Sequence, residues 1–82
     1  DYFNEINLYP NPTSDFININ ASNLLDLKGS IDIYNNLGQK VATKTVNSSS
    51  DLKVNVSNLS NGVYFINLNS GELTKKMKFI KE

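Results

Sequence analysis

Apolar and polar residues alternate along most of this chain, and clusters of turn residues interrupt the alternation roughly every 8–12 residues. Ile17 and Ile19 flank a single Asn, and the apolar side chains of Leu52–Val56 are separated by single polar ones. Because successive side chains of a strand point to opposite faces, this period of two indicates half-buried strands. Helical spacing is confined to 23–27, which Lys28 and Gly29 end after about one turn.

The alternating segments predict an all-β fold, a seven-stranded immunoglobulin-like antiparallel β-sandwich. A turn at Gly38 predicts a hairpin, and Val63–Ile66, apolar on both faces, predicts a central strand. The strands are expected at 6–8, 17–19, 31–33, 41–46, 52–56, 63–66 and 73–80. The expected core consists of Ile17, Ile19, Ile31, Ile33, Val41, Leu52, Val54, Val56, Leu59, Tyr64, Ile66, Leu68, Met77 and Phe79.

Length and composition limit what such a sandwich can do. With 82 residues the chain is expected to form one domain, and without cysteine it has no disulfide and no thiol. Eight lysines balance eight acidic residues, so no net charge attracts nucleic acid or anionic lipid. No apolar run approaches the roughly 20 residues of a membrane span. The start of the chain has no signal-peptide pattern and no Met, and we expect a piece of a longer precursor.

The residues offer little for catalysis or metal binding. Without His or Cys, neither a Ser-His-Asp nor a Cys-His set can form, and the aspartates lie beside turns, where solvation and capping explain them. We therefore predict no enzyme, no cofactor and no metal. Asn18, Asn20 and Asp32 would be the oxygens to converge on Ca²⁺, but the chain has no Asp/Asn loop of the calcium-binding kind.

The last expected strand is the most informative segment. Alternation puts Met77 and Phe79 on one face and Thr74, Lys76 and Lys78 on the other. Exposed lysines on a terminal strand serve either to protect a sheet edge or to offer a surface to a partner by strand addition, and both remain open. Phe79 is the one aromatic residue interleaved with these lysines, so nucleic acid is not expected.

Four segments in this order resemble a known family: Leu8–Pro12, Tyr34–Val41, Leu59–Ile66 and the Lys-rich last strand. Together they are similar to the type A C-terminal sorting domain of the type IX secretion system of Bacteroidetes-type bacteria. The resemblance implies a sorting domain over 7–82, preceded by a linker (1–6) to an upstream cargo domain.

The family further implies a non-catalytic secretion signal. Its cargo would pass through the periplasm and the outer-membrane translocon to the cell surface or the extracellular space. An outer-membrane shuttle protein would bind the domain, and a surface sortase-like peptidase would remove it near 1–6. By motif, Pro10, Asn11 and Pro12 shape the N-terminal turn, Gly38 and Gly62 permit turns, and Tyr64 stabilises the core. The machinery would recognise Lys75, Lys76, Lys78, Phe79, Ile80 and Lys81.

A second interpretation is a passive immunoglobulin- or fibronectin-like spacer, or a carbohydrate-binding module, of a secreted protein. Sugar sites offer exposed aromatic rings beside carboxamides and carboxylates. The candidate rings are Tyr2, Phe3, Tyr9 and Tyr34, for each of which packing in the core or at an edge is the simpler role.

Overall fold

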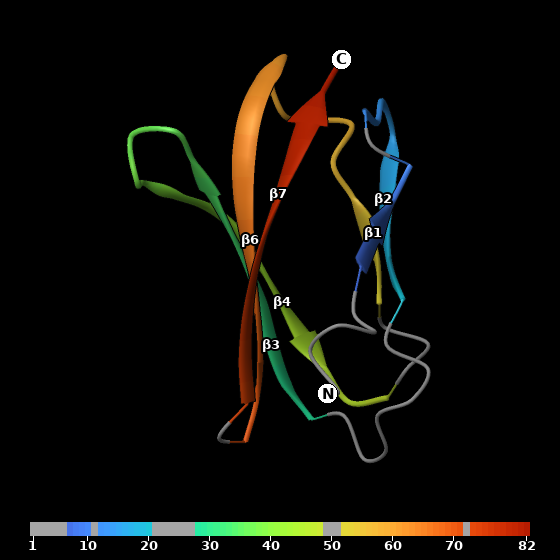
Figure 1. Ribbon diagram of the computed structural model, residues 1–82, viewed down its shortest axis with the longest axis vertical. Helices are drawn as coiled ribbons and strands as arrows, with labels where there is room; N and C mark the ends of the chain where they lie inside the picture. The colour runs from blue at the N-terminus through green and yellow to red at the C-terminus, as the bar shows by residue number, and fades with distance from the viewer. Residues whose placement is uncertain (1–6, 11, 21–27, 49–51, 72) are drawn as a thin grey trace.

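The computed structural model describes residues 7–10, 12–20, 28–48, 52–71 and 73–82. These residues form two antiparallel sheets packed face to face, and the described part of the chain contains no helix (Figure 1). The all-β sandwich is therefore confirmed, and its arrangement is consistent with an immunoglobulin-like fold. One sheet has the order β1-β2-β5 and the other β4-β3-β6-β7. The strands are β1 (Asn7–Tyr9), β2 (Phe16–Asn20), β3 (Gly29–Asn35), β4 (Lys40–Val46), β5 (Lys53–Asn55), β6 (Gly62–Ser70) and β7 (Leu73–Lys81).

The core lies between the two sheets and consists of the inward side chains of the alternating strands. Thirteen of the fourteen expected core residues lie in the core or against it, and Val41 is the exception. Leu59 and Met77 are partly buried and pack against the buried cluster. The other eleven are buried, together with Val46, which was not expected in the core: Ile17, Ile19, Ile31, Ile33, Leu52, Val54, Val56, Tyr64, Ile66, Leu68 and Phe79.

Val41 was expected in the core, and that prediction is wrong, because 41% of it is exposed. On β4 the inward positions are those of Ala42 and Val46, and Val41 has the opposite parity. The register between β3 and β4 shifts at Ile33/Tyr34, where Tyr34 pairs with Lys40 and Val41 is the extra residue. A bulge of this kind leaves no trace in the local pattern of apolar residues.

The predicted hairpin across Gly38 is confirmed, since β3 and β4 pair on either side of it. Gly38 has a φ of 83°, which glycine adopts at little cost. The Asn35 side chain closes the turn, because its Oδ1 accepts hydrogen bonds from the backbone N–H groups of Leu37 (2.9 Å) and Gln39 (3.0 Å). The Asn35 side chain thus supplies the hydrogen-bond acceptor that these two backbone N–H groups would otherwise lack within the turn.

The strand predicted to be central, β6, lies between β3 and β7. At one end of its pairing with β3, Gly29 approaches the β6 backbone so closely that a Cβ atom there would lie 1.9 Å from the carbonyl oxygen of Asn69. Gly29 thus opens β3 and permits close strand packing. The helical turn that Gly29 was expected to end, 23–27, lies outside the described residues.

Candidate functional site

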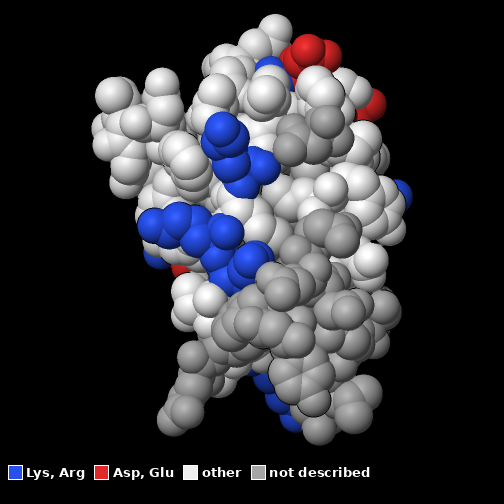
Figure 2. Space-filling model, viewed as in Figure 1, with Lys and Arg blue, Asp and Glu red and all other residues white. Residues whose placement is uncertain are grey.

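The segment predicted to be recognised by a partner lies in β7, one of the two outer strands of the four-stranded sheet. Its predicted division into two faces is confirmed: Phe79 is fully buried and Met77 partly buried, whereas Lys76 and Lys78 are exposed. The same alternation places Ile80 outward, with 40% of it exposed. In the view of Figure 2, lysine side chains gather on the face of the molecule that carries β7 in Figure 1.

The remaining lysines of this strand lie on its other face. Lys75 pairs in register with the buried Leu68 and is half-buried, and Lys81 is only 7% exposed. The Lys81 ammonium donates a hydrogen bond to the backbone oxygen of Glu82 at 3.2 Å. Of the six residues expected to be recognised, the structure therefore brings Lys76, Lys78 and Ile80 together on an accessible face. We define these three as the β7 face.

The C-terminal end of β7 is bound to the segment between β1 and β2. The Thr13 N–H donates to the Ile80 oxygen (2.9 Å), and the Glu82 N–H donates to the Thr13 oxygen (2.8 Å). Thr13 is 3% exposed, and its hydroxyl donates to the Phe16 backbone oxygen. We call the two backbone hydrogen bonds of Thr13, with Ile80 and Glu82, the Thr13 bridge. The bridge joins the two sheets at one side of the sandwich.

A second connection joins the sheets between β4 and β5. There the Lys44 ammonium donates a hydrogen bond to the Lys53 backbone oxygen at 2.7 Å.

The motif residues of the N-terminal turn follow β1, an outer strand of the three-stranded sheet. Pro10 and Pro12 are exposed, and the bond between Tyr9 and Pro10 is cis. Asn11 lies outside the described residues, as do the linker 1–6 and the candidate rings Tyr2 and Phe3. The turn leads directly to Thr13 and so lies beside the end of β7.

Tyr64 and Gly62 lie at the start of β6. Tyr64 is 7% exposed, its ring stacks on Phe79 with centroids 5.5 Å apart, and its hydroxyl donates to the Ser60 oxygen at 2.7 Å. Gly62 has a φ of 153° and directly precedes this buried segment. Tyr64 therefore fixes both the ring contact beneath β7 and the loop before β6.

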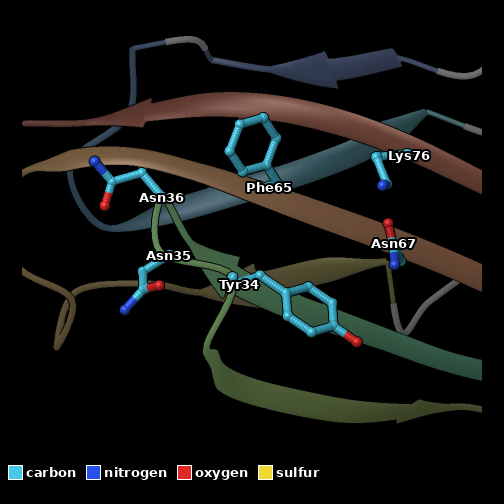
Figure 3. A pocket seen from close by; sticks show the side chains of 7 residues that line it. Tyr34, Asn35, Asn36, Phe65, Asn67 and Lys76 are labelled. Carbon is cyan, nitrogen blue, oxygen red and sulfur yellow. The ribbon is translucent and has the colours of Figure 1, made fainter.

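A hollow of about 400 Å³ lies on the outer face of the four-stranded sheet (Figure 3). Tyr34 of β3 and Phe65 of β6 are register partners, as are Asn67 of β6 and Lys76 of β7, so three strands contribute to it. We call it the Tyr34 hollow. It is lined by Tyr34, Asn35, Asn36, Gly38, Phe65, Asn67 and Lys76.

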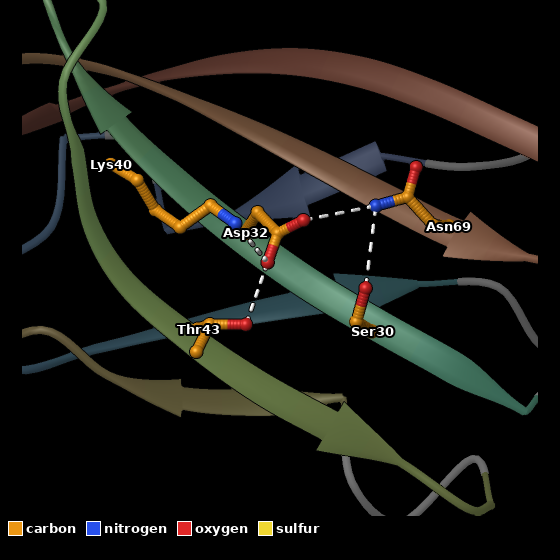
Figure 4. A network of polar contacts seen from close by, with 5 residues as sticks. All are labelled: Ser30, Asp32, Lys40, Thr43 and Asn69. Carbon is orange, nitrogen blue, oxygen red and sulfur yellow. Dashed lines mark hydrogen bonds and ion pairs between the residues drawn. The ribbon is translucent and has the colours of Figure 1, made fainter.

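Next to the hollow, the same face carries a network of polar contacts (Figure 4). Asp32 accepts hydrogen bonds from the Thr43 hydroxyl (2.6 Å) and the Asn69 amide (3.2 Å), and its carboxylate lies 3.8 Å from the Lys40 ammonium. The Asp32 carboxylate therefore already has partners on both neighbouring strands, β4 and β6. Asn18 and Asn20 lie on β2 in the other sheet, so they do not converge with Asp32 on a calcium ion.

Among the described residues, no group of three or more His, Cys, Asp or Glu side chains is placed to hold a metal ion. Nor does that part of the chain contain a helix long and apolar enough to cross a membrane. What the structure offers is a small β-sandwich module with an accessible, partly cationic sheet face.

Comparison with known proteins identifies the kind of module. Residues 7–82 match the family model described as a secretion system C-terminal sorting domain, and the chain belongs to this family, the sorting domains of the type IX secretion system. It is also 43% identical over 70 residues to beta-agarase A of Zobellia galactanivorans. That match covers 83% of this chain but 12% of the agarase. Membership in the family assigns the chain a role in protein export to the cell surface or extracellular space.

Sequence reasoning missed Thr13 and the Tyr34 hollow. Thr13 is one polar residue among several near the prolines, and its backbone partners in the bridge, Ile80 and Glu82, are more than sixty positions away in the chain. The hollow also depends on a register between strands that no local pattern contains. Tyr34 itself was named from the sequence as one of four candidate aromatic rings, and the structure places it in the lining of the hollow. A sugar contact at Tyr34 stays a prediction.

Proposed function

We propose that this chain is a non-catalytic secretion signal domain that directs an attached cargo protein across the outer membrane through the type IX secretion system. The observation that carries the proposal is the match of residues 7–82 to the family of sorting domains. The chain matches only 12% of the length of the agarase, which supports a role as one domain of a larger exported protein. The cargo would pass through the periplasm before it reaches the cell surface or medium.

An outer-membrane shuttle protein is the proposed partner, and the β7 face is its proposed contact. Lys76 and Lys78 are exposed, and Ile80 pairs in register with Val63, which is also 38% exposed. Two lysines beside an apolar pair suit a partner with acidic groups around an apolar centre. Charge of this kind mainly accelerates association and orients the partner.

The sheet face suits recognition better than strand addition at the C-terminal end of β7. There the Thr13 bridge already uses the Ile80 oxygen and the Glu82 N–H, the groups that an added strand would need. Phe79 and Lys81 are buried, so we propose that they stabilise β7, while Lys75 remains half-buried at its other end.

A surface sortase-like peptidase is proposed to cut near residues 1–6. The family match begins at residue 7, which supports a boundary there. Cleavage before β1 would leave both sheets of the sorting domain together.

The test fuses residues 1–82 to the C-terminus of a periplasmic reporter, in hosts with and without the type IX system. We expect surface or extracellular reporter only in the host that has the system, and periplasmic reporter when residues 73–82 are deleted. The deletion also removes an outer strand, so the intact fusion in the two hosts is the decisive pair. A reporter that stays in the periplasm of both hosts would indicate a passive spacer, and that result would refute the proposal.

A further inference from the structure

We propose that the Tyr34 hollow is a binding site for a saccharide, in which one pyranose ring lies against Tyr34 and Phe65. The hollow has a volume of about 400 Å³, within the range of small-molecule sites. This proposal does not depend on the export function, because it concerns a different ligand and is tested without secretion.

The aromatic part of the hollow comes from neighbouring strands. Tyr34 and Phe65 are directly opposite in the pairing of β3 with β6, so their side chains leave the sheet on the same face. Both are half-buried, and Figure 3 shows the two rings on the hollow's border. Aromatic faces bind the apolar C–H face of a sugar ring while leaving the ring hydroxyls at its edge.

The polar part contains an acceptor that needs a donor. The Oδ1 atom of Asn67 is buried, and no described residue donates a hydrogen bond to it. Buried polar atoms without a partner are uncommon and costly, so a small donor that reaches this atom would stabilise the complex. Lys76 pairs in register with Asn67 and brings an ammonium group, a donor only, to the same part of the hollow.

These two groups favour a hydroxylated ring over the side chain of a protein partner. An apolar side chain would leave Asn67 Oδ1 and the Lys76 ammonium dehydrated without partners. A carboxylate would suit Lys76, but it has no proton to donate to Asn67 Oδ1. Neighbouring sugar hydroxyls can both donate to Asn67 and accept from Lys76.

Another aromatic ring beside a lysine provides a contrast. Phe16, 41% exposed, lies under the Lys53 ammonium, which is 4.4 Å from the ring centroid. Asn18, nearby, already donates its amide to the Tyr9 oxygen at 3.3 Å. The ring face and the amide donor are therefore in use there, which makes Phe16 a matched control for an aromatic residue outside the Tyr34 hollow.

The experiment titrates the ¹⁵N-labelled 82-residue chain with cellohexaose, with a β-linked galactose hexamer, and with hexagalacturonate, each to about 10 mM. We expect saturable amide shifts around residues 34, 65, 67 and 76, with half-saturation at about 1 mM for at least one sugar. Tyr34→Ala should weaken binding at least tenfold, whereas Tyr34→Phe and Phe16→Leu should leave it within about twofold. Lys76→Gln, at an exposed position, should weaken binding without disturbing the fold.

The neutral and acidic hexamers distinguish a hydrogen bond from the Lys76 ammonium to a sugar hydroxyl from a charge contact with a carboxylate. Saturable binding of either kind of hexamer at the hollow supports the site. The proposal is overturned if no hexamer gives saturable shifts, if the shifts lie elsewhere, or if Tyr34→Ala and Lys76→Gln both bind normally. Export of the reporter fusion carrying Tyr34→Ala distinguishes the two proposals. Lost export with no sugar binding by the wild-type chain would make the hollow a protein contact instead.

Discussion

Tyr64 connects three parts of the molecule through one side chain. Its ring stacks on Phe79 beneath β7, its body is buried between the sheets, and its hydroxyl donates to the Ser60 oxygen in the loop before β6. A tyrosine whose hydroxyl bonds to backbone a few residues upstream is a recurring device in immunoglobulin-like sandwiches. The two functions of this side chain can be separated by substitution.

Tyr64→Phe keeps the ring and removes the hydrogen bond, so we expect a loss of about 1 kcal/mol in the free energy of unfolding. Phe79→Ala leaves a cavity in the core and should cost about 3–5 kcal/mol. A domain of this length has only about 4–12 kcal/mol in total. Urea unfolding followed by circular dichroism measures both values, and equal losses for the two variants would contradict the separation.

At single positions, alternation predicted most of the core and the outward lysines Lys76 and Lys78 correctly. It failed at Val41, because the bulge at Ile33/Tyr34 displaces that residue from the inward series. The same alternation places Lys81 on the inward face of β7, because Lys81 lies two residues after Phe79. A charged residue in a core position was not expected there because lysine is seldom buried.

Among the elements, β7 is held from both sides at its C-terminal end. It pairs with β6 along its whole length, and the Thr13 bridge binds its end to the segment after β1. Thr13→Pro removes the N–H that donates to Ile80, and we expect it to cost about 1–2 kcal/mol in unfolding free energy. The amide of Glu82 should then exchange hydrogen faster, because its acceptor, the Thr13 oxygen, is less well placed.

Thr13→Ser is the matched control, since it keeps the backbone N–H, the oxygen and a hydroxyl. Hydrogen exchange by NMR, with thermal unfolding of the same samples, measures both effects. Unchanged exchange at Glu82 in Thr13→Pro would show that the bridge does not hold the strand end.

At this scale the sequence predicted the seven strands, the hairpin at Gly38 and the central position of β6, because each depends on local alternation or turn residues. The partition into sheets of three and four strands was not predictable in the same way. It depends on contacts between distant segments, such as Thr13 with Ile80 and Lys44 with Lys53.

As a whole, the molecule is a small sandwich without disulfides that keeps one sheet face accessible. Its core and the two connections between the sheets hold β7 in place, while Lys76, Lys78 and Ile80 face outward. A rigid scaffold that presents the same surface on any cargo suits a sorting signal, because recognition then does not depend on the cargo.

The central claim is that the export machinery recognises the β7 face of the folded domain. The most direct measurement is the surface fraction of a reporter fused to the chain, in a host that has the type IX system. Lys76→Glu/Lys78→Glu should lower that fraction at least tenfold while the purified domain still unfolds cooperatively. Lys28→Glu/Lys53→Glu, a charge reversal of the same size at exposed positions outside β7, should leave delivery unchanged. Equal delivery of the two double variants would contradict the account.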